Sequence, residues 1–155
     1  MRNLKKPLKE LMEGWLLFKM KDLSLHILDI AENSIKSGAK KVLIKLIESK
    51  DILTLVIEDD GKGMDEETMK KALSPFFSTK KTSKYGLGLP LLKQACEATG
   101  GNLHLESELG KGTKVTAIFY KNHIDMKPLG DISATLISLQ SAQPDIEIEF
   151  DYEEK

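Results

Sequence analysis

A cluster of acid and glycine residues follows a strand-like run near the middle of the chain. Residues 59–63 read Asp-Asp-Gly-Lys-Gly, and only Glu58 separates them from the apolar run 52–57. A carboxylate at a strand end can accept a hydrogen bond from a ligand, and glycines let the backbone come close to that ligand. A tight turn with a solvated acid has the same composition, so both interpretations stay open. The spacing is neither a dinucleotide-binding fingerprint nor a Walker A loop.

Asp29 and Asn33 are four residues apart within a helical pattern, so they share one face of the helix. The carbonyl oxygen of an asparagine can ligate a hard cation such as Mg²⁺. An aspartate one turn earlier can orient or deprotonate a water molecule. Local capping or hydrogen bonding is the alternative explanation of this pair.

A second glycine-containing stretch, residues 86–89 with the sequence Gly-Leu-Gly-Leu, opens another predicted helix. Free backbone N–H groups and the positive dipole end at a helix start suit a phosphate group. Lys80, Lys81 and Lys84 lie just upstream, where they could add positive charge. A plain junction between a loop and a helix, with solvated lysines, is the alternative here.

The elements that must position these residues are helices alternating with hairpins. A helical pattern covers residues 21–39, and Leu25, Leu28, Ala31 and Ile35 are predicted to face a core. The other predicted elements are hairpin strands 41–47 and 52–57, helix 65–73, loop 74–85, helix 87–98, hairpin strands 103–106 and 115–119, helix 131–141 and a strand through 146–150. The acidic residues 151–154 are interpreted as a solvated tail. The pattern lacks a strand–helix–strand rhythm and predicts an α+β fold, a two-layer sandwich with a mixed or antiparallel sheet covered by helices on one face.

Composition limits the classes of function. The 155 residues predict one domain. A formal net charge of −1 provides no overall field for nucleic acid or membrane, and no apolar run approaches the roughly 20 residues that span a bilayer. The single cysteine, Cys96, excludes an internal disulfide framework and fits a reducing cytoplasm. We therefore expect a cytoplasmic protein that binds neither nucleic acid nor membrane.

The order of the motifs resembles the ATP-binding domain of the GHKL superfamily, which includes gyrase, a heat-shock chaperone, sensor histidine kinases and a mismatch-repair ATPase. Residues 29–39, 59–64, 75–80 and 86–89 are similar to its N, G1, F and G2 boxes. Residues 99–113 are similar to the final hairpin of histidine-kinase catalytic domains. The resemblance covers residues 22–120 and implies ATP and Mg²⁺ as ligands. It divides the chain into a helical extension 1–20, an ATP-binding domain 21–122 and a helix–strand extension 123–155.

The resemblance also implies roles for individual residues. Asp59 matches the carboxylate that accepts a hydrogen bond from the adenine amino group, and Asn33 matches the Mg²⁺ ligand. Asp29 occupies the place of a general base, and Lys80 that of a lid lysine near the γ-phosphate, within a lid at residues 74–85. The remaining predicted ATP-binding residues are Lys36, Gly61, Gly63, Met64, Phe77, Thr79, Gly86, Leu87, Gly88, Leu89 and Thr113.

Three departures from the family pattern matter. Asp29 is one methylene shorter than the glutamate of the ATPase and anti-sigma branches, and Lys84 replaces the first glycine of the G2 pattern. About 20 residues precede the N box, which leaves no room for a dimerisation hairpin with a phospho-accepting histidine. His26 lies inside the N-box helix and is interpreted as structural. We therefore do not expect a self-contained histidine kinase, and the chain has the size of the anti-sigma-factor serine kinases.

These observations predict a regulatory protein kinase that transfers the γ-phosphate of ATP to a partner protein. The alternatives are a slow ATPase and an ATP-gated binding module, either of which would act as a nucleotide-dependent switch. The partner is an unidentified protein substrate or regulator. The sequence leaves the oligomeric state open.

Overall fold

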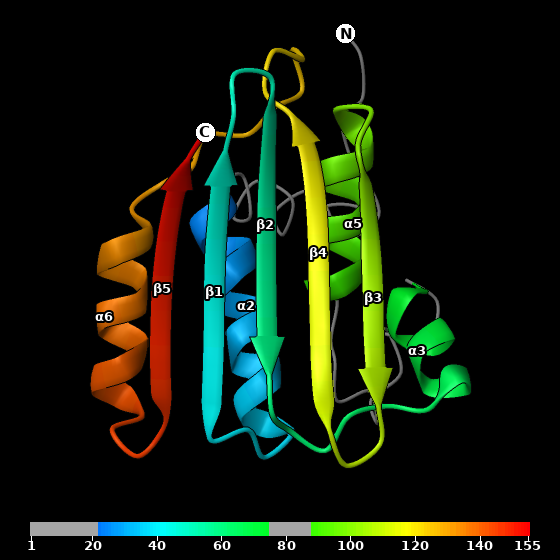
Figure 1. Ribbon diagram of the computed structural model, residues 1–155, viewed down its shortest axis with the longest axis vertical. Helices are drawn as coiled ribbons and strands as arrows, with labels where there is room; N and C mark the ends of the chain where they lie inside the picture. Colours follow the sequence, from blue (N-terminus) through cyan, green and yellow to red (C-terminus); the bar gives the residue numbers. More distant parts are fainter. Residues whose placement is uncertain (1–21, 75–87) are drawn as a thin grey trace, which may run out of the picture.

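The computed structural model describes residues 22–74 and 88–155, and these form two layers (Figure 1). The predicted extension 1–20 and most of the predicted lid lie outside the described residues. The helices are α2 (Leu23–Lys36), α3 (Glu66–Leu73), α5 (Gly88–Ala98) and α6 (Ile132–Ala142). The strands are β1 (Lys41–Glu48), β2 (Ile52–Asp59), β3 (Asn102–Glu108), β4 (Gly112–Tyr120) and β5 (Glu147–Glu154).

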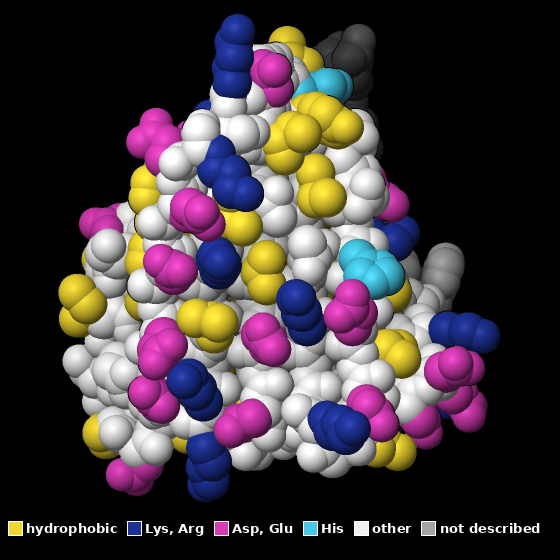
Figure 2. All heavy atoms as spheres, in the orientation of Figure 1, with side chains coloured by type: hydrophobic (Ala, Val, Ile, Leu, Met, Phe, Trp, Pro, Cys, Tyr) yellow, Lys and Arg dark blue, Asp and Glu magenta, His cyan; other side chains and the backbone are white. Residues whose placement is uncertain are grey.

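The five strands form one mixed sheet in the order β3-β4-β2-β1-β5. The predicted hairpins β1–β2 and β3–β4 are both antiparallel, whereas β5 returns parallel to β1. Helices α2 and α5 lie behind the sheet in Figure 1. The opposite face carries charged side chains interspersed with apolar ones (Figure 2). The predicted α+β sandwich is confirmed.

Aspartate side chains begin three of the helices. Asp22, Asp65 and Asp131 are the N-caps of α2, α3 and α6, and each accepts a hydrogen bond from a backbone N–H three residues later. Such caps satisfy N–H groups that the first turn of a helix leaves without a partner. Local sequence therefore sets where these helices begin.

The core lies between α2, α5 and the inner face of the sheet. Alternate residues of the central strands are buried there, as period-2 alternation requires. The fully or almost fully buried strand residues include Val42, Ile44, Leu46, Leu53, Leu55, Ile57, Ala117 and Phe119.

The predicted core face of α2 is confirmed in part, because Ala31 lies in the core and Leu28 and Ile35 pack against it. Of Leu25, Leu28, Ala31 and Ile35, only Ala31 is buried. The buried residues are Leu23, Ser24, His26, Ile27, Ile30, Ala31 and Ser34. Hydrophobicity alone missed part of this face, because the polar residues Ser24, His26 and Ser34 are buried as well.

The prediction that residues 151–154 form a tail is wrong, although these residues are exposed to solvent as predicted. These residues complete β5 and are in register with Lys45–Glu48 of β1. The side chains of Lys41 and Lys45 pair with Glu149 and Glu153 at 3.4 and 3.9 Å. Strand β1 thus supplies both the backbone partners and the countercharges for this acidic segment.

Thr99 joins the end of α5 to the sheet. It is 2% exposed, donates its hydroxyl to the Cys96 carbonyl at 2.8 Å, and accepts the Tyr120 N–H at 3.0 Å. Replacing it by valine leaves the Tyr120 N–H without its acceptor, while the Cys96 carbonyl keeps its bonds from the backbone N–H groups of Thr99 and Gly101. We expect Thr99→Val to lower the free energy of unfolding by about 1–3 kcal/mol in a urea titration.

Thr99→Ser is the matched control for this prediction, because it keeps the hydroxyl and loses only a methyl group. We expect its free energy of unfolding to stay closer to that of the unaltered protein than the valine variant does. Equal losses in the two variants would show that the hydroxyl is not what joins α5 to β4.

Candidate functional site

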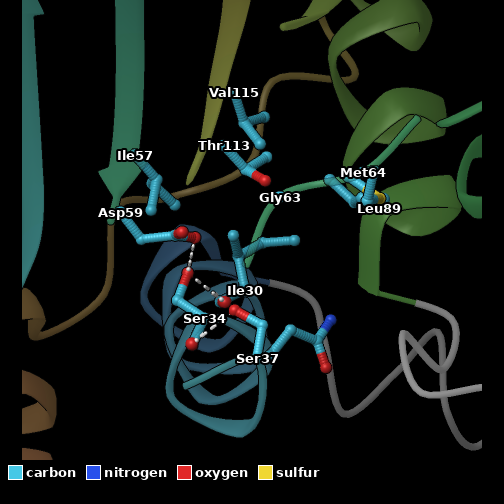
Figure 3. A pocket seen from close by; sticks show the side chains of 11 residues that line it. Ile30, Ser34, Ser37, Ile57, Asp59, Gly63, Met64, Leu89, Thr113 and Val115 are labelled. Atoms are coloured by element: carbon cyan, nitrogen blue, oxygen red, sulfur yellow. Dashed lines mark hydrogen bonds between the residues drawn. The ribbon is translucent and has the colours of Figure 1, made fainter. Parts of the chain in front are cut away.

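A pocket opens between α2, the end of β2, the start of α5 and β4 (Figure 3). Its walls combine apolar side chains with a few polar groups. The lining residues are Ile30, Asn33, Ser34, Ser37, Ile57, Asp59, Gly63, Met64, Leu89, Thr113 and Val115.

The Asp59 carboxylate is held by two hydrogen bonds. Its Oδ2 accepts the Ser34 hydroxyl at 2.6 Å, and its Oδ1 accepts the Gly61 N–H at 2.9 Å. Ser34 is only 4% exposed, and Figure 3 shows its side chain pointing from α2 toward Asp59. A short hydrogen bond to an ionised oxygen is among the stronger kinds in proteins. The carboxylate therefore has one fixed orientation at the base of the pocket.

Apolar side chains surround this carboxylate. Ile57 precedes Asp59 by two residues on the same strand face, and Val115 is in register with Ile57 on β4. Met64 and Leu89, each 4% exposed, close the opposite side. Apolar walls with one fixed acceptor suit a flat heteroaromatic ring that carries an amino group. This combination matches adenine.

The glycines of the acidic turn allow segments of the chain to come close to one another. Gly63 has φ of +73°, and a methyl group there would overlap the Glu108 carbonyl. A methyl group at Gly61 would overlap the Ser37 hydroxyl oxygen. The turn is thus packed between α2 and the β3–β4 hairpin, with Gly63 also lining the pocket.

Asp29 and Asn33 lie where α5 begins. A methyl group at Gly88 would overlap the Asp29 carboxylate and come within 3.4 Å of the Asn33 side-chain nitrogen. Burial raises the pKa of Asp29, the nearby Glu32 carboxylate adds to this rise, and Lys36 opposes it. The structure thus places a partly desolvated carboxylate and an amide at one edge of the pocket.

The structure brings together most of the predicted site residues that it describes. The pocket-lining ones are Asn33, Asp59, Gly63, Met64, Leu89 and Thr113, while Gly61, Asp29 and Gly88 adjoin them. Lys36 is exposed on α2 and does not line the pocket. Phe77, Thr79, Lys80, Gly86 and Leu87 lie outside the described residues.

Sequence reasoning missed five lining residues: Ile30, Ser34, Ser37, Ile57 and Val115. Ile57 carried a usable signal, because it shares the strand face of Asp59. Ser34 carried none, because its partner is 25 residues away and the contact requires α2 to pack on β2.

The fold and the pocket together define a nucleotide-binding protein. Residues 19–123 match the family described as "Histidine kinase-, DNA gyrase B-, and HSP90-like ATPase". The chain belongs to this family of ATP-binding domains, and the pocket around Asp59 is the candidate for its ATP site.

Three relatives are bacterial sensor or sporulation kinases of Bacillus subtilis (strain 168). The chain is 31% identical over 86 residues to a "Probable C4-dicarboxylate sensor kinase". It is 34% identical over 95 residues to "Sensor histidine kinase YvrG" and 33% identical over 94 residues to "Sporulation kinase D". The matches cover 56, 57 and 58% of this chain, but only 16, 16 and 18% of the relatives.

We predict that Asp59→Asn weakens ATP binding by at least about 100-fold, because an amide donor can then face the adenine amino group. Isothermal titration calorimetry with ATP measures the change. Asp60→Asn is the matched control: Asp60 is exposed and accepts the Lys40 and Lys41 N–H groups outside the pocket. Unchanged affinity in Asp59→Asn would contradict this assignment of the adenine site.

We predict a smaller effect for Ser34→Ala, about 2–10-fold weaker ATP binding, because Asp59 loses one of the two bonds that orient it. Ser24→Ala is the matched control, since the buried Ser24 makes a comparable 2.7 Å bond to Asp22 near the other end of α2. The control should keep its ATP affinity. Equal affinity losses in both variants would indicate a general effect on α2.

Proposed function

We propose that this chain is a regulatory protein kinase that uses Mg²⁺ and ATP to phosphorylate a hydroxyl group of a partner protein. The observation that carries the proposal is the Asp29 carboxylate, partly desolvated beside Gly88 and one helical turn from Asn33, at the edge of the ATP pocket. The kinase relatives support it at the level of the family.

Asn33 is the residue that would hold Mg²⁺. Its amide oxygen is a hard donor at the rim of the pocket, which fits a cation that takes few protein ligands and keeps several waters. When bound, Mg²⁺ supplies positive charge that offsets the negative charge of the phosphate oxygens. Lys36, Lys80 and the backbone of residues 86–89 are proposed to add to this charge neutralisation.

Asp29 would act on the attacking group. Its carboxylate accepts the proton of the partner's hydroxyl as that oxygen bonds to the γ-phosphorus. The bond between the γ-phosphorus and the bridging oxygen breaks, and ADP leaves with that oxygen. A carboxylate whose pKa is raised by burial is a stronger base than a solvated one, which suits this step. Most of the catalysis is positioning and electrostatic stabilisation.

The second candidate is a nucleotide-gated binding module with slow or no hydrolysis. The residue that favours it is Asp29 itself, which is shorter than the glutamate expected of a general base and is already in contact with the start of α5. ATP bound here would then bias the position of α5 and expose a surface for a partner.

The cytoplasm is the proposed compartment, on the basis of the single cysteine. That residue, Cys96, is buried, and its burial raises the pKa of the thiol to about 11, which keeps it protonated and unreactive. Within residues 22–74 and 88–155, no helix is both long and apolar enough to cross a bilayer.

We predict that Asp29→Asn lowers phosphate transfer by about 100-fold or more while ATP affinity stays within about threefold. The measurement is transfer of label from γ-labelled ATP to proteins of a cell extract, with free phosphate counted in parallel. Glu66→Gln on α3 is the control, because Glu66 is exposed and is not among the groups that shift the pKa of Asp29. Transfer by the unaltered protein should also fall as the pH drops through the pKa of Asp29, since the protonated carboxyl accepts no proton.

Stability provides an independent check on the same variant. Because the pKa of Asp29 is raised in the fold, its stabilising contribution is complete below the ordinary value of 3.8 and is lost as the pH rises through the raised value. At any pH at which Asp29 is ionised in the folded protein, Asp29→Asn should therefore raise the melting temperature. Loss of transfer with gain of stability separates a catalytic role from unfolding. Intact bound ATP and no labelled protein would support the gated module instead.

A further inference from the structure

An apolar groove lies between the edge strand β5 and helix α6. It is lined by Ser133, Leu136, Ile137, Gln140, Ile148 and Phe150. None of these residues lines the ATP pocket, and all lie beyond the matched segment 19–123. Ile137 is 66% exposed, Phe150 39% and Tyr152 47%. Two large apolar side chains of the groove, Ile137 and Phe150, are therefore exposed to solvent, and so is Tyr152 further along β5.

The outer edge of β5 has backbone groups available for pairing. In parallel pairing, successive residues direct their backbone bonds alternately toward the neighbouring strand and away from it. Glu147 donates its N–H to the backbone just before β1 at 2.9 Å, so the even-numbered residues face outward. The Gln140 side chain accepts the outward Ile148 N–H at 3.2 Å. Among the described residues, none bonds the outward backbone groups of Phe150 and Tyr152.

The charge of β5 is strongly negative. Its eight residues include five carboxylates and no lysine or arginine. Its odd-numbered residues project on the open face of the sheet, opposite the face of Ile148 and Phe150. Lys41 and Lys45 pair with two of these carboxylates at 3.4 and 3.9 Å. Asp151 forms no ion pair with any part of the chain that the structure describes.

We propose that β5 and α6 form a docking site for an extended segment of a partner protein, which adds to the sheet as a sixth strand. Its backbone pairs with Phe150 and Tyr152. Its apolar side chains lie over Ile137 and Phe150, and its alternate side chains are Lys or Arg beside the carboxylates of β5. A second copy of β5 is disfavoured, because carboxylates would then oppose carboxylates.

A random 12-residue peptide library displayed on phage tests the site without knowledge of the partner. We expect selection on the full chain to enrich peptides in which apolar residues alternate with Lys or Arg. An enriched peptide, synthesised with a fluorescent label, should bind with an affinity that falls as salt rises. Hydrogen exchange should show added protection at the Phe150 and Tyr152 amides.

Two variants and two controls make the test specific. Ile137→Glu and Asp151→Lys should each weaken peptide binding at least tenfold. Leu109→Glu, at a position 62% exposed in the β3–β4 turn, and Glu97→Lys on α5 should leave it unchanged. The proposal would be overturned if the selection yielded no binder or enriched unpatterned or acidic peptides. It would also be overturned if all variants bound the peptide equally, or if the chain dimerised and Ile137→Glu abolished the dimer. The readout needs no ATP, so it is independent of the proposed kinase activity.

Discussion

The packing of α2 on β1 and β2 is the constraint on which both the fold and the pocket around Asp59 depend. Ile27 and Ile30 of this helix are buried against the inner face of the sheet. Because a helix turns about 100° per residue, burying this side brings Ser34 to Asp59 and leaves Asn33 at the pocket rim. The same apolar burial that stabilises the domain thus orients its polar groups.

The two aspartates of the site, Asp29 and Asp59, lie in different surroundings. Asp59 accepts two hydrogen bonds, which fix the orientation of its carboxylate. Asp29 loses part of its solvation beside Gly88, and its pKa rises for that reason. A carboxylate kept in such surroundings opposes stability and favours proton acceptance, as is common at catalytic centres. This contrast between the two aspartates is the main physical support for giving them different roles.

The segment after residue 123 extends the family domain in a specific way. Helix α6 packs mainly against α2, and β5 pairs along the full length of β1. The hydroxyl of Tyr152 donates to Glu48 at 2.7 Å, and the same glutamate pairs with Lys121 of the preceding loop at 2.7 Å. The extension is therefore part of the same sheet and core.

The sequence alone was sufficient for the helices, both hairpins and most described residues of the site. Helical periodicity, strand alternation, aspartate caps and glycine turns are local signals, and the motif order linked Asn33, Asp59 and Gly88. It was not sufficient for the buried side of α2, because Ser24, His26 and Ser34 are polar residues that only the packed helix places inside. It also missed the end of β5, because acidic residues resemble a solvated tail until a strand with lysines lies beside them. The tertiary structure decided the Ser34–Asp59 and Glu48–Tyr152 bonds, since these join residues 25 and 104 positions apart, beyond the reach of any local pattern.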